Sequence, residues 1–391
     1  MNYITKIFVL LLSFTVEPIA FAQHSIHFID GGLTDALKRS KTENKPVFLM
    51  CYASWCSHCN NMKNNIFTDS SVANFYNQHF ICAKQDMEQG EGINLHNNFQ
   101  IKSYPTFLFL DSYGIILYRL TGELLAPELI TEGDNALTPE RQLPYLKQQF
   151  ENDVSNSNYC YDYLRALKKG GINYADVVKK YFSTQSDKQL LSETNWRIIA
   201  NGISDINSRE FQFVLHHQKE FFSLASPERV ERKIFFLVKE LLNPLVYAND
   251  TINYFIKRQP AAAIHQFKID SLLFTNDIKL YERTQNWEAY KKATLQSTKT
   301  FAWYDYSLLR DIANVYLNNI LDTPSLSMSV TWAIQSLSLH EQYSTYILCA
   351  KLYLKTNDLQ SAIQMANKGK EIALKYKWDY SEADKLLKEL Q

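Results

Sequence analysis

The sequence Trp55-Cys56-Ser57-His58-Cys59 comes two residues after the apolar run 47–52, which has the length and composition of a buried strand. Two cysteines with two residues between them can cycle between a dithiol and a disulfide. We expect Cys56 to stand at the start of a helix, where backbone amides and the positive end of the helix dipole stabilise a thiolate. The motif therefore predicts redox chemistry.

Around this motif, residues 23–132 alternate short apolar runs with helical patterns. We expect strands at residues 47–52, 80–84, 106–110 and 115–120, and helices after Cys56, after Asp69 and at residues 93–99. Asp111-Ser112-Tyr113-Gly114 is typical of a tight turn and joins the last two strands into a hairpin. Such alternation predicts an α/β domain, with a mixed sheet covered by helices.

Beyond residue 132 the sequence favours helices. Glycine and prolines in the segment 133–152 predict a linker or exposed loop. We expect an α-helical region over residues 153–300, since helical patterns there are separated by polar turns. These patterns cover residues 159–167, 211–222, 230–242 and 251–256.

The last segment, residues 301–391, has a repeat-like pattern. Ala350, Tyr353, Ala362 and Gly369 resemble the small, aromatic, small and small positions of a tetratricopeptide repeat, where small side chains let two helices approach. A generic helical hairpin accounts for the same residues, because small residues are common at helix crossings. Stacked helical pairs build protein-binding surfaces, so a partner protein on this helical region is one expectation.

The N-terminal residues predict export. Lys6 precedes the apolar residues 7–12, and Ala20-Phe21-Ala22 is a small-x-small cleavage site just before Gln23. We therefore expect a signal peptide at residues 1–22, secretion across the inner membrane and a periplasmic location. A transmembrane helix is the alternative, but Glu17-Pro18 interrupts the apolar run before it reaches the ~20 residues that span a bilayer.

Composition narrows the function class. The 391 residues include 41 Lys or Arg and 41 Asp or Glu, so net charge gives no indication of nucleic-acid binding. Only 11 glycines and 10 prolines, against 24 tyrosines and 23 phenylalanines, predict an ordered chain with aromatic cores. Six cysteines are too few for a disulfide scaffold, and we interpret Cys160 and Cys349 as small core residues of helices.

Tyr104-Pro105-Thr106, at the start of the third predicted strand, is a second motif. With both motifs in order, residues 40–125 resemble the thioredoxin superfamily, and in particular its periplasmic thioredoxin-like members. The resemblance implies a thioredoxin fold without a bound cofactor, in which Cys56 attacks a substrate disulfide and Cys59 resolves the mixed disulfide. It also implies that Pro105 is a cis-proline beside which the substrate strand binds. Trp55 would pack beside the cysteines, with plain core packing as the alternative.

His58 bears on the direction of the reaction. A histidine between the cysteines resembles protein disulfide isomerases and bacterial periplasmic disulfide oxidases, whereas thioredoxin has proline there. A nearby imidazolium stabilises the thiolate and makes the disulfide a better oxidant. The alternative is a solvent-facing His58 with little effect, because water screens exposed interactions.

One position beneath the motif departs from thioredoxin. A buried aspartate that helps to deprotonate the resolving thiol is replaced by Met50, although Lys84 matches the lysine that accompanies it. By the family alignment, Cys82 shares a face of the sheet with Met50 and Lys84, whereas Cys51 faces the other side. We therefore expect Cys51 and Cys82 to be free buried thiols.

Metal binding is the rival interpretation of the motif. Cys56 and Cys59 supply half of a tetrahedral zinc site, but no second pair has suitable spacing, so we predict no metal. The leading hypothesis is a secreted thiol:disulfide oxidoreductase that acts on protein thiols or disulfides and is recycled by a redox partner. The alternative is a protein-binding helical scaffold whose thioredoxin-like module docks partners with little turnover.

Overall fold

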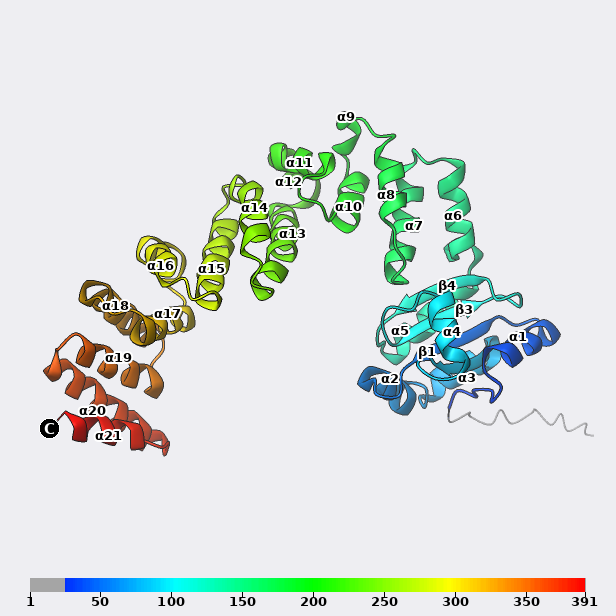
Figure 1. The fold of residues 1–391 in the computed structure, drawn as a ribbon. Coiled ribbons are helices and arrows are strands. Elements are labelled where there is room, and N and C mark those ends of the chain that lie inside the picture. The colour runs from blue at the N-terminus through cyan, green and yellow to red at the C-terminus, as the bar shows by residue number, and fades with distance from the viewer. Residues whose placement is uncertain (1–24, 391) are drawn as a thin grey trace, which may run out of the picture. The chain divides into compact units, whose positions relative to one another are not determined.

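The computed structural model describes residues 25–390 (Figure 1). These residues divide into two compact units, a first unit that ends at Ile203 and a second unit that begins at Ser204. The predicted signal peptide at residues 1–22 lies outside the described residues. Within the described part, no helix is both long enough and apolar enough to cross a membrane.

The first unit contains the sheet. Its strands are β1 (Val47–Tyr52), β2 (Ile81–Asp86), β3 (Thr106–Leu110) and β4 (Ile116–Thr121), in the order β2-β1-β3-β4. β1 pairs parallel with β2, whereas β3 pairs antiparallel with both β1 and β4. The sheet is mixed, as predicted, and the predicted strands overlap all four observed ones.

Helices cover both faces of this sheet. One face packs against α2 (Ser57–Asn61), the π-helix η1 (Met62–Ile66), α3 (Ser70–His79) and α5 (Ala126–Leu137). The other face packs against α1 (Gly32–Glu43) and α4 (Glu91–Asn98). Successive side chains of a strand point to opposite faces, so Phe48 and Met50 enter the first core and Leu49 and Cys51 the second. The fold is therefore a mixed sheet between two helical layers.

α4 lies especially close to the backbone that follows β2. A Cβ atom on Gly92 would stand 1.7 Å from the carbonyl oxygen of Asp86. The same stretch is tied to β1, because the Met87 amide donates to the Tyr52 carbonyl at 2.8 Å. Glycine at position 92 is thus what allows α4 to approach the carboxyl end of the sheet.

The expected linker at residues 133–152 is mostly helical, so that expectation was wrong. α5 continues to Leu137, and a short 3-10 helix, η2 (Pro139–Arg141), leads into α6 (Leu143–Asn152). Gly133 lies buried in α5, where a Cβ atom would come within 2.5 Å of Cε1 of Phe75. Pro139 and Pro144 stand in the first turns of η2 and α6, positions where a missing amide hydrogen costs no helical bond.

Helices that follow the sheet pack on its edge. β4 is an edge strand, and both α6 and α7 (Ser157–Lys169) contact it. Lys169 Nζ donates to the Tyr118 hydroxyl at 3.0 Å, and a Cβ atom on Gly170 would lie 3.1 Å from Cγ of Arg119. The first unit is completed by α8 (Ala175–Phe182), α9 (Asp187–Leu190) and α10 (Glu193–Gly202).

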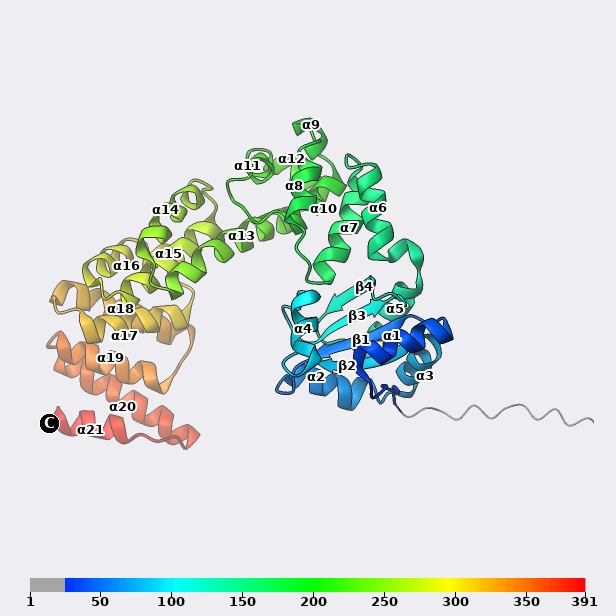
Figure 2. The same cartoon turned by 45° about the vertical axis from the view of Figure 1, so that its right-hand side comes forward.

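The second unit is an array of helices, which follow one another side by side from α13 to α21 (Figure 2). They are α11 (Arg209–His216), α12 (Gln218–Ala225), α13 (Pro227–Tyr247), α14 (Thr251–Ala262), α15 (Phe267–Arg283), α16 (Trp287–Phe301), α17 (Tyr306–Asn319), α18 (Thr323–Leu339), α19 (Tyr343–Lys355), α20 (Leu359–Tyr376) and α21 (Ser381–Glu389). The predicted helix at 211–222 is divided into α11 and α12 at His217. The unit boundary falls inside the predicted α-helical region 153–300.

The predicted small residues of the C-terminal segment lie at a helix crossing. Ala350 and Ala362 are buried, and a Cβ atom on Gly369 would lie 3.1 Å from Cβ of Tyr346. α19 and α20 pack closely as a result. The helical pair is present, and its assignment to the tetratricopeptide family stays a prediction.

Candidate active site

The two motif cysteines lie at the start of α2, which follows β1 in the chain. Cys56 is the N-cap residue of α2, and its Sγ accepts a hydrogen bond from the Cys59 amide at 3.1 Å. The two residues form a disulfide with their Cα atoms 5.2 Å apart. Cys56 retains 5% exposure, whereas Cys59 is fully buried. Cys56 is thus the less buried of the two residues, and its sulfur is the one that a helix amide stabilises as a thiolate.

The Pro105 segment lies beside this motif. The Tyr104–Pro105 peptide bond is cis, as the resemblance implied. The ring of Tyr104 meets the ring of Trp55 edge-on, with 6.1 Å between the ring centres. The carbonyl of Pro105 accepts from the Gly122 amide at 2.9 Å, which connects this segment to the end of β4. Three stretches distant in sequence therefore converge on the cysteine pair.

Trp55 lies on the surface of this site. Its side chain is 69% exposed, so it is not a core residue. The indole Nε1 donates to Oε2 of Glu88 at 2.9 Å, and this bond fixes the ring beside Tyr104. An exposed, fixed indole next to a disulfide offers an apolar surface and a polar edge to a bound chain.

His58 has a partner that the sequence did not indicate. Its Nδ1 lies 2.5 Å from Oε2 of Glu123, which follows β4. The side-chain amide of Asn61 donates to the other oxygen of the same carboxylate. These two hydrogen bonds, first that of His58, hold the pKa of Glu123 below its ordinary value. The histidine is solvent-exposed, yet it is held by a carboxylate and does not stand free.

Met50 occupies the place of the buried aspartate of thioredoxin. Met50 is fully buried, and the strand register places it opposite Lys84. Lys84 Nζ lies 5.3 Å from the ring centre of Phe28. A thioether therefore fills the place of the aspartate, and it accepts no proton from a thiol at ordinary pH.

The other cysteines are buried and free, as predicted. Cys51 belongs to the core under α1 and α4, whereas Cys82 belongs to the core on the opposite face of the sheet. Burial raises the pKa of both thiols far above the ordinary value. Burial also raises the pKa of Cys160 and of Cys349 to about 12. Thiols of this kind are poor nucleophiles, because the reactive form is the thiolate.

Residues 25–390 contain no candidate metal site. Across them, no three side chains of His, Cys, Asp or Glu gather in a way that could hold a metal ion.

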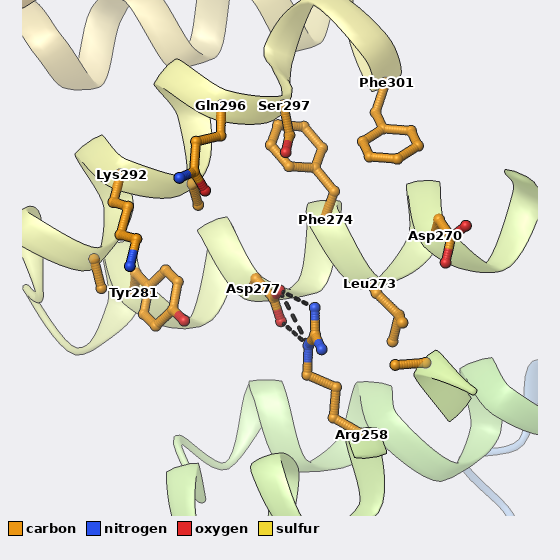
Figure 3. Close-up of a pocket in the computed structure, with 13 residues that line it drawn as sticks. Arg258, Asp270, Leu273, Phe274, Asp277, Tyr281, Lys292, Gln296, Ser297 and Phe301 are labelled. Atoms are coloured by element: carbon orange, nitrogen blue, oxygen red, sulfur yellow. Dashed lines mark hydrogen bonds and ion pairs between the residues drawn. The ribbon is translucent and has the colours of Figure 1, made fainter. Parts of the chain in front are cut away.

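A separate pocket lies in the second unit, between α14, α15 and α16 (Figure 3). It has a volume of about 560 Å³. Arg258 and Asp277 form an ion pair in its wall, with Nη2 and Oδ2 2.7 Å apart, and the Tyr254 hydroxyl donates to the same carboxylate at 2.6 Å. Since these charges satisfy one another, they brace the helices around the pocket.

Comparison with known proteins bears on the first unit. The family model for a thioredoxin-like domain matches residues 33–136. Spermatogenesis-associated protein 20 of Mus musculus is 31% identical over 80 residues, which make up 20% of this chain and 9% of that protein. Protein disulfide-isomerase A5 of Mus musculus is 24% identical over 104 residues, or 27% of this chain and 20% of that protein. The chain thus spans only a small part of the length of these curated relatives.

Two solved structures resemble part of the chain. One is a candidate disulphide-isomerase from Bacteroides thetaiotaomicron, 39% identical, with a TM-score of 0.28 and coverage of 30% of this chain and 97% of that one. The other is DsbH oxidoreductase, 21% identical, with a TM-score of 0.27 and coverage of 33% and 94%. Residues 33–136, with their mixed sheet and the Cys56–Cys59 pair at a helix start, are a thioredoxin-like domain and belong to the thioredoxin superfamily.

Proposed function

We propose that this protein is a thiol:disulfide oxidoreductase that exchanges protein disulfides through the Cys56–Cys59 couple. The observation that carries the proposal is the position of Cys56 at the N-cap of α2, next to Trp55, whose ring contacts Tyr104 of the cis Tyr104–Pro105 segment. Buried Cys59 stands within disulfide distance to complete the exchange. The couple needs no bound cofactor.

Each half-reaction transfers two electrons and two protons. In the reducing direction, the Cys56 thiolate attacks a substrate disulfide, and one substrate sulfur leaves as a thiolate that takes up a proton. Cys59 then loses its proton and attacks Sγ of Cys56, which releases the second substrate thiol and leaves the Cys56–Cys59 disulfide. The oxidising direction is the reverse, and in either case a redox partner must restore the starting state.

The test of this function is the variant Cys56→Ser, assayed for insulin reduction and for oxidation of a reduced protein substrate. We expect both activities to fall to the background rate, because the attacking sulfur is lost. Cys160→Ser, which removes a buried thiol far along the chain, is the matched control and should keep the activity of the unaltered protein. Undiminished turnover by Cys56→Ser would reject the proposal.

The reduction potential of the Cys56–Cys59 couple, together with the redox partner, sets the direction. His58 between the cysteines favours an oxidase or isomerase, so we expect a value near the ~−120 to −180 mV of such proteins. A value near the ~−270 mV of thioredoxin would favour a reductase instead. The measurement is an equilibrium titration of the Cys56–Cys59 couple against glutathione.

We also propose export to the periplasm, on the strength of the leader-like residues 1–22. N-terminal sequencing of the protein from a periplasmic fraction should begin at Gln23. Recovery of a chain that retains Met1 would contradict export by cleavage.

A second candidate function is partner binding by the second unit. Ile252, Phe255 and Ile256 share one face of α14 and are 74%, 39% and 62% exposed. A hollow of about 410 Å³, also lined by Tyr281, lies next to two of them. Exposed apolar side chains that are grouped in this way are typical of protein-binding surfaces. In this alternative, Cys56→Ser would leave partner binding unchanged.

A further inference from the structure

Glu123 links the end of the sheet to the helix that carries the cysteines. Gly122, with a φ of +97°, turns the chain after β4, and its amide is bound to the Pro105 carbonyl. The next residue, Glu123, contacts Nδ1 of His58 with one carboxylate oxygen and accepts from Asn61 with the other. The carboxylate is therefore fixed at both oxygens by residues of α2.

The Glu123 carboxylate determines which nitrogen of the His58 imidazole carries the hydrogen. It accepts a hydrogen only if Nδ1 carries one, so neutral His58 holds its hydrogen on Nδ1 and leaves Nε2 bare. A bare Nε2 accepts a proton. The carboxylate then stabilises the imidazolium that results, as an aspartate does beside the histidine of a catalytic triad.

The motif supplies a proton for this pair. His58 lies two residues after Cys56 and one before Cys59. If Nε2 of His58 takes the Cys56 proton in the reduced protein, directly or through water, Cys56 becomes a thiolate beside an imidazolium.

We propose that Glu123 is a positioning residue that acts through His58 to set the thiolate fraction of Cys56. This inference rests on the proposed function and concerns how the reactivity of Cys56 at the same site is set. Glu123 does not touch the sulfurs in the structure, and its effect passes through the ring.

Other charged groups surround the motif and belong in the design of the test. Glu88 is bound to the Trp55 indole. Lys63, on η1, lies 4.3 Å from the ring centre of Tyr52 and interacts with Lys84 and Asp86. Because none of these groups is altered in the variants below, their contributions cancel in the comparison.

The experiment measures the pH dependence of Cys56 alkylation by iodoacetamide in the reduced full chain. For Glu123→Gln we expect the alkylation rate at neutral pH to fall by about two- to fivefold, the range of an exposed ion pair, and the midpoint to move to higher pH. Glu123→Asp keeps the charge and should retain more of the rate. Glu43→Gln removes an exposed carboxylate paired with Arg39 at the opposite end of β1 and should leave the profile unchanged.

A double-mutant cycle separates the route through His58 from a direct effect. In the His58→Gln background, Glu123→Gln should cause no further change in rate or midpoint. An unchanged profile for Glu123→Gln, or an equal fall in both backgrounds, would overturn the inference. A thermal melt of each variant tests whether the fold is kept.

Alkylation needs no protein substrate, so this result is independent of turnover. If Cys56→Ser abolishes exchange but Glu123→Gln leaves alkylation unchanged, only this inference fails. If the unaltered protein exchanges no disulfides, the proposed function fails whatever the alkylation profile.

Discussion

The two sulfurs of the active site differ in what surrounds them. Cys56 caps α2 and keeps a small exposed surface, whereas Cys59 has none. We therefore expect a protein substrate to react with Cys56 first. The order of attack and resolution follows from this difference in access.

This difference predicts the behaviour of Cys59→Ala. Without the resolving sulfur, the mixed disulfide between Cys56 and its substrate cannot collapse, so covalent complexes should accumulate. They are measured on non-reducing gels after acid quenching and should disappear on reduction. Cys56→Ala is the matched control and should trap nothing, and equal trapping by both variants would contradict the assigned order.

The buried thiols give a second prediction. Burial raises the pKa values of Cys51, Cys82, Cys160 and Cys349, so their thiolate fraction is negligible at neutral pH. In the reduced, folded protein we expect fast alkylation at Cys56 and protection of these four until the chain is denatured. Mass mapping of the labelled peptides measures this, and rapid labelling of Cys82 in the folded state would contradict its placement.

At this scale, some of the site could be read from the sequence and some could not. The opposite facing of Cys51 and Cys82 was predicted from strand alternation together with the family alignment, and the two cores confirm it. Glu123 was missed because its bond to His58 joins two residues that only the fold brings together. Nothing in the local sequence around Glu123 indicates that contact.

The elements of the sheet domain depend on close packing at a few positions. Gly92 is the tightest of them, because a Cβ atom there would overlap the Asp86 carbonyl. Its backbone approach connects α4 to the strand end from which Glu88 reaches Trp55. A change at this contact is therefore expected to reach the site through the β2–α4 connection.

We predict that Gly92→Ala destabilises the protein. Alanine favours helix over glycine by about 1 kcal/mol, but the clash is with backbone, which side-chain motion cannot relieve, and overpacking costs about 1–3 kcal/mol. Urea unfolding of the first-unit signal should show a net loss of stability. Asn94→Ala, at an exposed position of the same helix, is the control, and equal stability of both variants would contradict the packing seen here.

The packing of these helices also explains why the linker prediction for residues 133–152 was wrong. Glycine and proline are read from sequence as breakers, yet Gly133 serves the approach of Phe75 and the two prolines stand in first turns. The strands were predicted well because their apolar runs are continuous and flanked by turn residues. Breaker residues carry opposite meanings in a loop and in a packed helix, and only tertiary contacts distinguish them.

The second unit adds an array of helices to the chain that carries the redox motif. Its division from the first unit at Ile203 and Ser204 was not visible in the sequence, since helices continue on both sides. Composition and periodicity identify helices but not which neighbours they pack against. The exposed face of α14 gives a way to test for a role in recruitment.

We predict that this face selects substrates for the cysteine couple. In the Cys59→Ala background, Ile252→Ser combined with Ile256→Ser should reduce the amount of trapped protein without changing the alkylation rate of Cys56. The single change Lys257→Ser, at an exposed position of the same helix, is the control for an altered surface. Trapping that is unaffected by the two isoleucine changes would leave substrate choice to the first unit alone.

The contact of α7 with β4 has a consequence for how this protein can be divided. A strand at the edge of a sheet presents unpaired amides and carbonyls, which invite pairing with another chain and aggregation. Here α6 and α7 cover that edge, with Lys169 and Gly170 against Tyr118 and Arg119. A fragment cut after Leu137 would contain every residue of the redox motif but would leave the edge of β4 uncovered. The helices that cover this edge end at Lys169, so a fragment that keeps the edge covered must include the residues up to that position.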